Sequence, residues 1–539
     1  MRGPSWVPAL ACTVGVSVVI GCSHPPAPAP AAVFDLEEAT IASLQQRMES
    51  GQDTARSIAE KYLARIEAID RSGPELHSVI EINPDALALA DALDAERKTK
   101  GPRSPLHGIP VLIKDNIATA DHMQTTAGSL ALEGSIAPAD AFLVAKLRDA
   151  GAVILGKTNL SEWANFRSTH SSSGWSGRGG LTRNPYALDR NPSGSSSGSG
   201  VAAAANLAAV AIGTETDGSV VSPSNNNALV GIKPTIGLIS RFGIVPISHS
   251  QDTAGPMTRT VADAALLLTV MSGSDPADPA THDSDAKRQR DYSKFLDAGG
   301  LSGARLGVIR QRLMGYSPAT DRVMEAAIAD LKRLGAIIVD PADVATIGQF
   351  DDSELEVLLY EFKADLNKYL AWLGPHARVH SLKDVIEFDE AHRDTEMPYF
   401  GQELMLRAQD KGPLTDKAYL AALEKNHRLS QREGIDAVMD RMHLDALIAP
   451  TSGPPWLTDL VNGDYSTNGS STIAAVAGYP HITVPAGQTF GLPIGLSFIG
   501  RAWSEPVLLK LAYAYEQGTK RRAPPTFVPT APLDLRPPR

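Results

Sequence analysis

Cysteine is nearly missing from this sequence of 539 residues, because both of its cysteines, Cys12 and Cys22, stand close to the N-terminus. The long body of the chain after them therefore has no disulfide framework, no cysteine nucleophile and no thiolate metal site. An excess of basic residues is missing too, since the formal net charge is −11. A nucleic-acid partner calls for basic patches, so this balance argues against one. We expect neither a metal nor a cofactor.

A long apolar run is also missing. The N-terminal run from Val7 to Ile20 is interrupted by Gly and Ser, and it is shorter than the roughly 18 apolar residues that indicate a membrane-spanning helix. A run of this kind is typical of a signal peptide. It ends in Gly21 directly before Cys22, which resembles the lipobox of bacterial lipoproteins, where the cysteine carries the lipid. An ordinary signal peptide that contains a cysteine is the alternative.

A segment rich in Pro and Ala, residues 22–33, follows this run and predicts an extended tether. We therefore expect three parts: a signal peptide of the lipoprotein type over residues 1–21, the tether over 22–33, and a folded domain over 34–530. The expected localisation is the periplasm or the cell surface of a bacterium. In this interpretation the protein contacts the membrane only through a lipid on Cys22.

Strand and helix patterns alternate along the folded part. Helical spacing of apolar residues predicts helices over 54–69 and 85–98. Short apolar runs predict strands over 109–114, 152–155, 209–212, 447–449, 481–485 and 494–499. This alternation predicts a single α/β domain with a mixed, largely parallel central sheet covered by helices. Two longer helical segments, 354–373 and 416–441, are candidates for a lid.

The first of these strands ends in a lysine. A lysine in water has a pKa of about 10.4 and is useless as a base at neutral pH. Lys114, however, directly follows the apolar residues Val111, Leu112 and Ile113. Burial removes the hydration of the amine and lowers its pKa. A neutral amine at this position can accept a proton from a serine hydroxyl.

Two serine-bearing segments follow. Residues 192–200 are rich in Ser and Gly and lead directly into an Ala-rich helical pattern, so they are a loop that opens a helix and not a linker. Residues 213–219 form a turn after a short apolar strand. Successive amides in such a turn make a concave site for an oxyanion. One lysine and two serines on separate elements are a set that can transfer an acyl group without histidine.

Two local matches to other hydrolases are rejected. Residues 194–198 match the G-x-S-x-G nucleophile elbow, but that motif requires a hydrophobic strand immediately before it, and this chain has Asp189-Arg190-Asn191 there. Residues 284–287 spell the S-x-x-K of β-lactamases. They lie in a charged segment, and the sequence has no S-D-N or K-T-G partner motif.

The order of these motifs resembles the amidase signature family, and the resemblance covers nearly the whole body of the chain. Besides the lysine, the Ser/Gly loop and the turn, it rests on residues 231–235, 252–257, 477–480 and 483–485. The resemblance implies the amidase signature fold and an enzyme that hydrolyses amides. Many motifs in one order make this resemblance specific.

The resemblance also implies a role for each candidate residue. Ser219 matches the nucleophile, Ser195 the bridging serine carried on a cis peptide bond, and Lys114 the terminal base. We therefore expect the Ser195 hydroxyl to lie within hydrogen-bond reach of both the Ser219 hydroxyl and the Lys114 amine. The oxyanion is expected to bind the backbone amides of the residues before the nucleophile, Thr216, Asp217 and Gly218.

The turn departs from most members of the family. Where they have Gly-Gly-Ser-Ile-Arg, this chain has Asp-Gly-Ser-Val-Val at 217–221. Residues 215–219, 161–166 and 250–256 instead resemble the peptide amidase branch, which removes the C-terminal amide of peptides. The substrate expected from this resemblance is a peptide carboxamide, and the products are the free acid and ammonia. Three alternatives remain: a hydrolase of fatty or small-molecule amides, a glutamine-hydrolysing amidotransferase subunit, and a tethered binding protein without activity.

Overall fold

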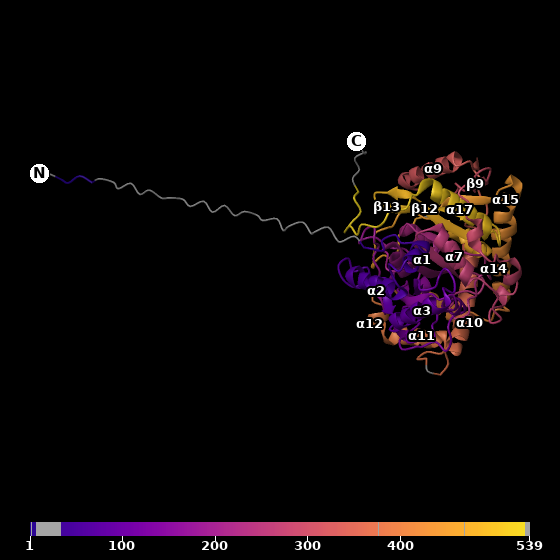
Figure 1. The fold of residues 1–539 in the computed structure, drawn as a ribbon, viewed down its shortest axis with the longest axis horizontal. Helices are drawn as coiled ribbons and strands as arrows, with labels where there is room; N and C mark the ends of the chain where they lie inside the picture. The colour runs from indigo at the N-terminus through magenta and orange to yellow at the C-terminus, as the bar shows by residue number, and fades with distance from the viewer. Residues whose placement is uncertain (2, 7–33, 376, 468, 534–539) are drawn as a thin grey trace. The chain divides into compact units, whose positions relative to one another are not determined.

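The computed structural model describes residues 1, 3–6, 34–375, 377–467 and 469–533. The chain divides into two units, Met1–Glu37 and Glu38–Arg539. The described residues of the first unit contain no helix or strand. All helices and strands of the described chain belong to the second unit (Figure 1).

Among the described residues, a sheet of 11 strands runs through the second unit in the order β1-β3-β2-β6-β8-β7-β12-β13-β11-β9-β10. The strands are β1 (Val79–Ile82), β2 (Pro110–Lys114), β3 (Val153–Thr158), β6 (Val210–Glu215), β7 (Val230–Lys233), β8 (Thr253–Thr258), β9 (Arg305–Val308), β10 (Ile337–Val339), β11 (Ala446–Pro450), β12 (His481–Thr489) and β13 (Leu492–Ile499). A separate pair consists of β4 (Trp175–Ser176) and β5 (Gly180–Leu181).

The predicted fold class is confirmed, because the second unit is one α/β domain with a mixed sheet and flanking helices. Parallel pairing occurs in two groups, β3-β2-β6 and β11-β9-β10. Between these groups, β8, β7, β12 and β13 pair antiparallel with their neighbours. The first parallel group carries the predicted lysine.

The principal helices are α1 (Ile41–Glu49), α2 (Ala55–Arg65), α3 (Ala86–Lys100), α4 (Phe142–Asp149), α5 (Ser197–Ala204), α6 (Val221–Asn226), α7 (Val261–Met271), α9 (Pro318–Arg333), α10 (Asp351–Leu373), α11 (Leu382–Ala391), α13 (Glu403–Gln409), α14 (Lys417–His427), α15 (Asp436–Met442), α16 (Ser471–Ala477) and α17 (Glu505–Thr519). Helix α5 contacts α6 and the strands β2, β3, β6 and β8, and α6 contacts β7, β12 and β13. Helices α9 and α17 lie beside β12 (Figure 1).

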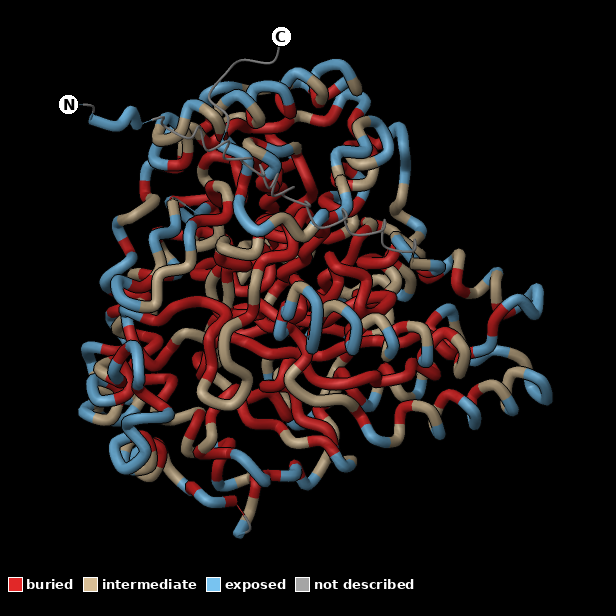
Figure 2. Tube along the Cα trace, turned by 90° about the vertical axis from the view of Figure 1, so that its left-hand side faces the viewer, coloured by how far each residue is buried: buried red, intermediate tan, exposed pale blue. Residues whose placement is uncertain are grey.

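Every residue of β2, β3 and β6 is buried. Strands covered on both faces are apolar along their whole length, and the sequences PVLIK, VILGKT and VAIGTE largely follow this rule. Figure 2 shows buried segments gathered inside and exposed segments on the outer helices. The lysine that ends β2 is therefore held in the interior of the domain.

Candidate active site

The site lies where β2 and β6 end. These strands are parallel neighbours with Val111 opposite Val210 and Ile113 opposite Ile212. Because parallel strands have their carboxyl ends at the same edge of a sheet, the residues that follow them are brought together there. Lys114 is the last residue of β2, and the turn that contains Ser219 follows β6.

Lys114 points at the bridging serine. Its Nζ lies 2.8 Å from Ser195 Oγ and 2.9 Å from Thr214 Oγ1. Asn116 Nδ2 donates a second hydrogen bond of 2.9 Å to the same Thr214 oxygen. The side chains of Lys114 and Ser195 are fully buried. The predicted contact between lysine and serine is therefore present, and Thr214 holds the amine in place.

Burial sets the charge of this amine. It lowers the pKa of Lys114 to about 7, although the negative charges of Asp252 and Glu215 act in the opposite direction. No carboxylate of a described residue forms an ion pair with the Lys114 amine. Desolvation favours the neutral form of a lysine. The amine is thus neutral in a large fraction of molecules at neutral pH.

The Ser/Gly loop leads directly into α5, and no strand immediately precedes it. This agrees with the rejection of the G-x-S-x-G nucleophile elbow. Its Gly194–Ser195 peptide bond is cis, as predicted. A Cβ at Gly194 would lie 2.2 Å from Ser161 Oγ, so only glycine fits at this position. The amide of Ser193 donates to Asn191 Oδ1 over 2.7 Å, and the hydroxyls of Ser193 and Ser222 are 2.7 Å apart.

The turn after β6 is fixed from three sides. Glu215 Oε2 accepts hydrogen bonds from the amides of Val220 (2.7 Å) and Val221 (3.0 Å), on the far side of Ser219. The hydroxyl of Thr216 donates to Asp252 Oδ1 over 2.6 Å. Thr472 Oγ1 donates to Asp217 Oδ2 over 2.7 Å. These contacts hold the backbone on both sides of the predicted nucleophile.

Gly218 meets a steric requirement in the same turn. Its φ is +78°, a conformation that residues with a Cβ rarely adopt, and a Cβ there would lie 2.9 Å from Ser471 Oγ. The amides of Asp217 and Gly218 donate no hydrogen bond to a described residue. Unpaired amides in a turn are suited to a negatively charged oxygen.

The two serine segments are in contact through their backbones, since the amide of Ser196 donates to the carbonyl of Ser219 over 3.2 Å. The described residues show no direct hydrogen bond between the hydroxyls of Ser195 and Ser219. Lys114, Ser195 and the turn 216–219 are thus in one place, with the lysine bonded to the first serine.

Asp252 and Gln251 take part in the site although no role was predicted for them. Asp252 Oδ2 accepts hydrogen bonds from two backbone amides, those of Ile247 (2.8 Å) and Ser248 (2.9 Å). Burial raises the pKa of Asp252 to about 6. Gln251 Nε2 donates to the Thr216 carbonyl over 3.4 Å. Both belong to residues 250–256, one of the segments that carry the family resemblance. Asp252 directly precedes the buried strand β8, and this position could have identified it as a site residue.

A cavity of about 400 Å³ is lined by residues that contact the turn, although none of residues 216–219 lines it. Among its lining residues, Thr472 contacts Asp217, and Glu354 contacts Gln251 (2.8 Å), which in turn contacts Thr216. Asp351 also lines this cavity. Thr472 and Glu354 thus connect this cavity to the turn.

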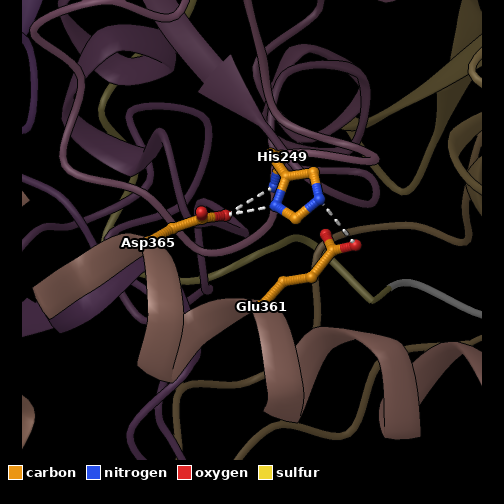
Figure 3. A group of neighbouring side chains, drawn as sticks. All are labelled: His249, Glu361 and Asp365. Atoms are coloured by element: carbon orange, nitrogen blue, oxygen red, sulfur yellow. Dashed lines mark hydrogen bonds and ion pairs between the residues drawn. The ribbon is translucent and has the colours of Figure 1, made fainter. Parts of the chain in front are cut away.

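One group of described side chains has the composition of a metal site. It consists of His249, Glu361 and Asp365, and it contains none of the predicted catalytic residues (Figure 3). Asp252 connects this group to the turn, because it contacts both Ser248, the neighbour of His249, and Thr216.

Comparison with known proteins agrees with this geometry. A family model described as Amidase matches residues 57–509. A probable amidase of Arabidopsis thaliana is 44% identical over 504 residues, which cover 92% of this chain and 93% of that protein. The native peptide amidase of Stenotrophomonas maltophilia is 52% identical, with a TM-score of 0.87 and coverage of 92% of this chain and 99% of that one. A peptide amidase in complex with the competitive inhibitor chymostatin is also 52% identical, with a TM-score of 0.88 and coverage of 92% and 100%.

The predicted localisation, a periplasmic or cell-surface lipoprotein of a bacterium, is wrong. The relatives found include amidases of a plant and of fungi, peptide amidases and bacterial glutamyl-tRNA(Gln) amidotransferase subunits, and none of these is described as a lipoprotein. A short apolar run before a cysteine carries too little information to outweigh them. Cys22 and the rest of residues 7–33 lie outside the described residues. In the part of the chain that is described, no helix is long and apolar enough to cross a membrane.

Proposed function

Because the chain belongs to the amidase family and is an amide-hydrolysing enzyme, we propose that it hydrolyses the C-terminal carboxamides of peptides with Ser219 as the nucleophile. The observation that carries the proposal is the buried Lys114 amine, 2.8 Å from Ser195 Oγ, whose pKa is lowered to about 7 by burial. A neutral amine bonded to a hydroxyl is able to start a proton relay.

In the relay, Lys114 takes the proton of Ser195, and Ser195 takes the proton of Ser219. Ser219 Oγ then attacks the carbonyl carbon of the amide, and the carbonyl oxygen becomes negatively charged. The backbone amides of Thr216, Asp217 and Gly218 bind this oxyanion. Donors that are fixed before the reaction stabilise the transition state without reorganisation, and the contacts of Glu215 and Asp252 hold this turn rigid.

The leaving group receives its proton through the same relay. Ser195 donates a proton to the amide nitrogen and is reprotonated by the Lys114 ammonium, so the C–N bond breaks and ammonia leaves. Ser219 is then esterified by the acyl group. A water molecule gives a proton to the relay and attacks the ester carbonyl, and the carboxylic acid and free Ser219 are released.

The substrate class is supported by the comparisons. Two solved structures at 52% identity are peptide amidases, and one of them binds the competitive inhibitor chymostatin. We expect a small NH₂ leaving group to be accepted and internal peptide bonds to survive, because an internal bond requires room for a continuing chain.

The test is a comparison of one peptide in two forms, a C-terminal amide and a free acid. We expect ammonia and the intact free acid from the amide, and no change in the free acid. The Ser219→Ala variant is the matched inactive control. Cleavage of internal bonds, or activity restricted to fatty amides, would refute the peptide carboxamide substrate and leave Ser219 as the nucleophile. Full activity of Ser219→Ala would refute the mechanism itself.

A further inference from the structure

We propose that His249, as an imidazolium held between two carboxylates of α10, is a positioning residue for the turn that carries Ser219. This inference rests on the proposed function of Ser219. His249 is distant in the sequence from the predicted relay and touches none of its three residues. Its influence is transmitted through the segment 247–252, which contacts α10 on one side and Thr216 on the other.

The ring of His249 has a carboxylate at each nitrogen (Figure 3). Nδ1 lies 2.8 Å from Asp365 Oδ2, and Nε2 lies 3.3 Å from Glu361 Oε1. The backbone amide of His249 also donates to Asp365 Oδ2, over 2.9 Å. A neutral imidazole has only one N–H and would direct a lone pair at one of the carboxylates. Two N–H groups, and hence a positive charge, suit this arrangement.

The same contacts argue against a metal ion. The two carboxylates face different ring nitrogens, so one ion bound to Nε2 would have Glu361 beside it and Asp365 on the opposite side of the ring. Glu361 is fully buried and already accepts hydrogen bonds from Ser250 N (3.0 Å), Ser250 Oγ (2.5 Å), Tyr419 OH (2.6 Å) and Ser248 Oγ. A metal ion would have to displace several of these donors. A protonated ring needs no such rearrangement.

Two hydrogen bonds connect the neighbour of His249 to the turn. Ser248, next to His249, donates its amide to Asp252 Oδ2 over 2.9 Å. The other oxygen of Asp252 accepts the hydroxyl of Thr216 over 2.6 Å. Thr216 is one of the proposed oxyanion donors. Release of the segment from α10 would therefore loosen the turn at the point where the oxyanion binds.

The charge of His249 depends on pH, because its ring has access to solvent. The side chain is 41% exposed, and it lines a cavity of about 540 Å³ together with Arg241, Asp252, Lys368 and Trp372. Burial lowers the pKa of His249, but the hydrogen bond to Asp365 and the charges of Glu361 and Asp365 outweigh this, so its pKa is raised above 6.5; Arg241 acts against the shift. On the far side, Tyr419 and His427 face Glu361.

The raised pKa of His249 determines how its ion pairs depend on pH. The ion pairs with Glu361 and Asp365 are complete below the pKa of the ring and are lost as the pH rises through it. The neutral Lys114 amine, in contrast, becomes more abundant as the pH rises. We therefore expect the reactivity of Ser219 to increase with pH because of Lys114 and then to decline because of His249.

The experiment measures the rate at which a fluorophosphonate probe labels Ser219 in the full-length protein as a function of pH, with the labelled residue identified by mass spectrometry. In His249→Gln the ring charge is absent at every pH. We expect labelling about tenfold slower than in the parent protein at neutral pH, and no decline at alkaline pH. In Asp365→Asn the hydrogen-bond acceptor remains but its charge is lost, so the decline should move to lower pH.

His122→Gln is the matched control, because His122 also pairs with a carboxylate, Asp85 over 2.6 Å, but at an exposed position. Its labelling profile should equal that of the parent. An unchanged profile in His249→Gln would overturn the proposal, as would stoichiometric zinc that is lost in this variant together with activity. If the parent protein is not labelled on Ser219, the proposed function fails instead, so the two failures are distinguishable. Circular dichroism shows whether each variant is folded.

Discussion

Two neighbouring strands of this protein each carry a buried lysine near their carboxyl end, and only one of the two lysines is placed for catalysis. Lys114 ends β2, and Lys157 in β3 lies opposite Ile113. Both side chains are completely buried. Burial lowers the pKa of Lys114 to about 7 and that of Lys157 to about 8.

The partners of the two amines differ. Lys157 Nζ donates to the carbonyl of Ile117 over 2.6 Å and to Thr125 Oγ1 over 2.8 Å, and the charges of Asp115 and Asp121 favour its protonated form. Both amines thus contact a hydroxyl, that of Thr125 for Lys157 and that of Ser195 for Lys114. Only the Ser195 hydroxyl belongs to the loop whose backbone contacts Ser219. Burial makes a lysine available as a base, but the position of its hydroxyl partner beside the proposed nucleophile makes it useful.

Substitution of the two lysines should give the largest contrast. We expect Lys114→Ala to lower kcat by a factor of about 10²–10⁴, the usual range for loss of a general base. Lys114→Arg should do little better, since arginine keeps its proton. Lys157→Met should retain kcat within a factor of about three, because its partners lie outside the relay. Initial rates of ammonia release measure this, and a comparable loss in Lys157→Met would abolish the distinction.

The pH dependence sharpens the same contrast. Because the neutral form of Lys114 is the active one, kcat/KM should rise about tenfold per pH unit below pH 7 and level off above it. The alkaline decline assigned to His249 is removed by measuring in the His249→Gln background. Lys157→Met should leave the midpoint of the rise unchanged. If the midpoint moves in Lys157→Met but not in a Lys114 variant, the rise of kcat/KM with pH belongs to Lys157 and not to Lys114.

A smaller effect is expected at Thr214, which holds the Lys114 amine. Thr214→Val keeps the shape of the side chain but removes the acceptor of Lys114 Nζ and Asn116 Nδ2. Loss of one such hydrogen bond should lower kcat about tenfold. Thr158→Val on β3, which removes a hydroxyl 2.7 Å from Ser199 Oγ, is the control. Equal losses in both variants would show a general structural effect.

The smallest effect on activity is expected for Lys157→Met, which should instead lower the stability of the protein. Lys157→Met leaves the Ile117 carbonyl and Thr125 without their buried donor. We expect the free energy of unfolding to fall by about 1–3 kcal/mol, the cost of unsatisfied buried polar groups. Urea unfolding measures this, with the exposed Lys98 changed to Met as the control. Unchanged stability would mean that relief of the buried amine offsets the lost hydrogen bonds.

Much of the site was predictable, because its parts follow recognisable local patterns. An apolar run that ends in Lys114 predicted a buried amine, and the structure has one. The cis bond before Ser195 was also predicted, from the family resemblance, and is present. The contact between the serine hydroxyls, which was expected too, is not direct in the described residues.

Other features depend on contacts that no local pattern reveals. Strands β7 and β8 contain Gly or Pro, which disfavour strands in sequence-based reasoning, yet both pair inside the sheet. The antiparallel centre of the sheet was therefore not foreseen. In the chain, His249 is 112 residues from Glu361 and 116 residues from Asp365. Their meeting depends on where α10 packs.

The parallel pairing of β2 with β6 has a consequence for how the enzyme acquires activity during folding. Lys114 and Thr214 are separated by 100 residues in sequence. Contacts of this range require closure of a long loop before they gain any stabilisation, so they form slowly and late. Helices such as α10 depend mainly on local contacts. After dilution from denaturant, the helical circular dichroism signal should therefore recover before Ser219 becomes reactive, which makes catalytic competence a report on completed long-range folding.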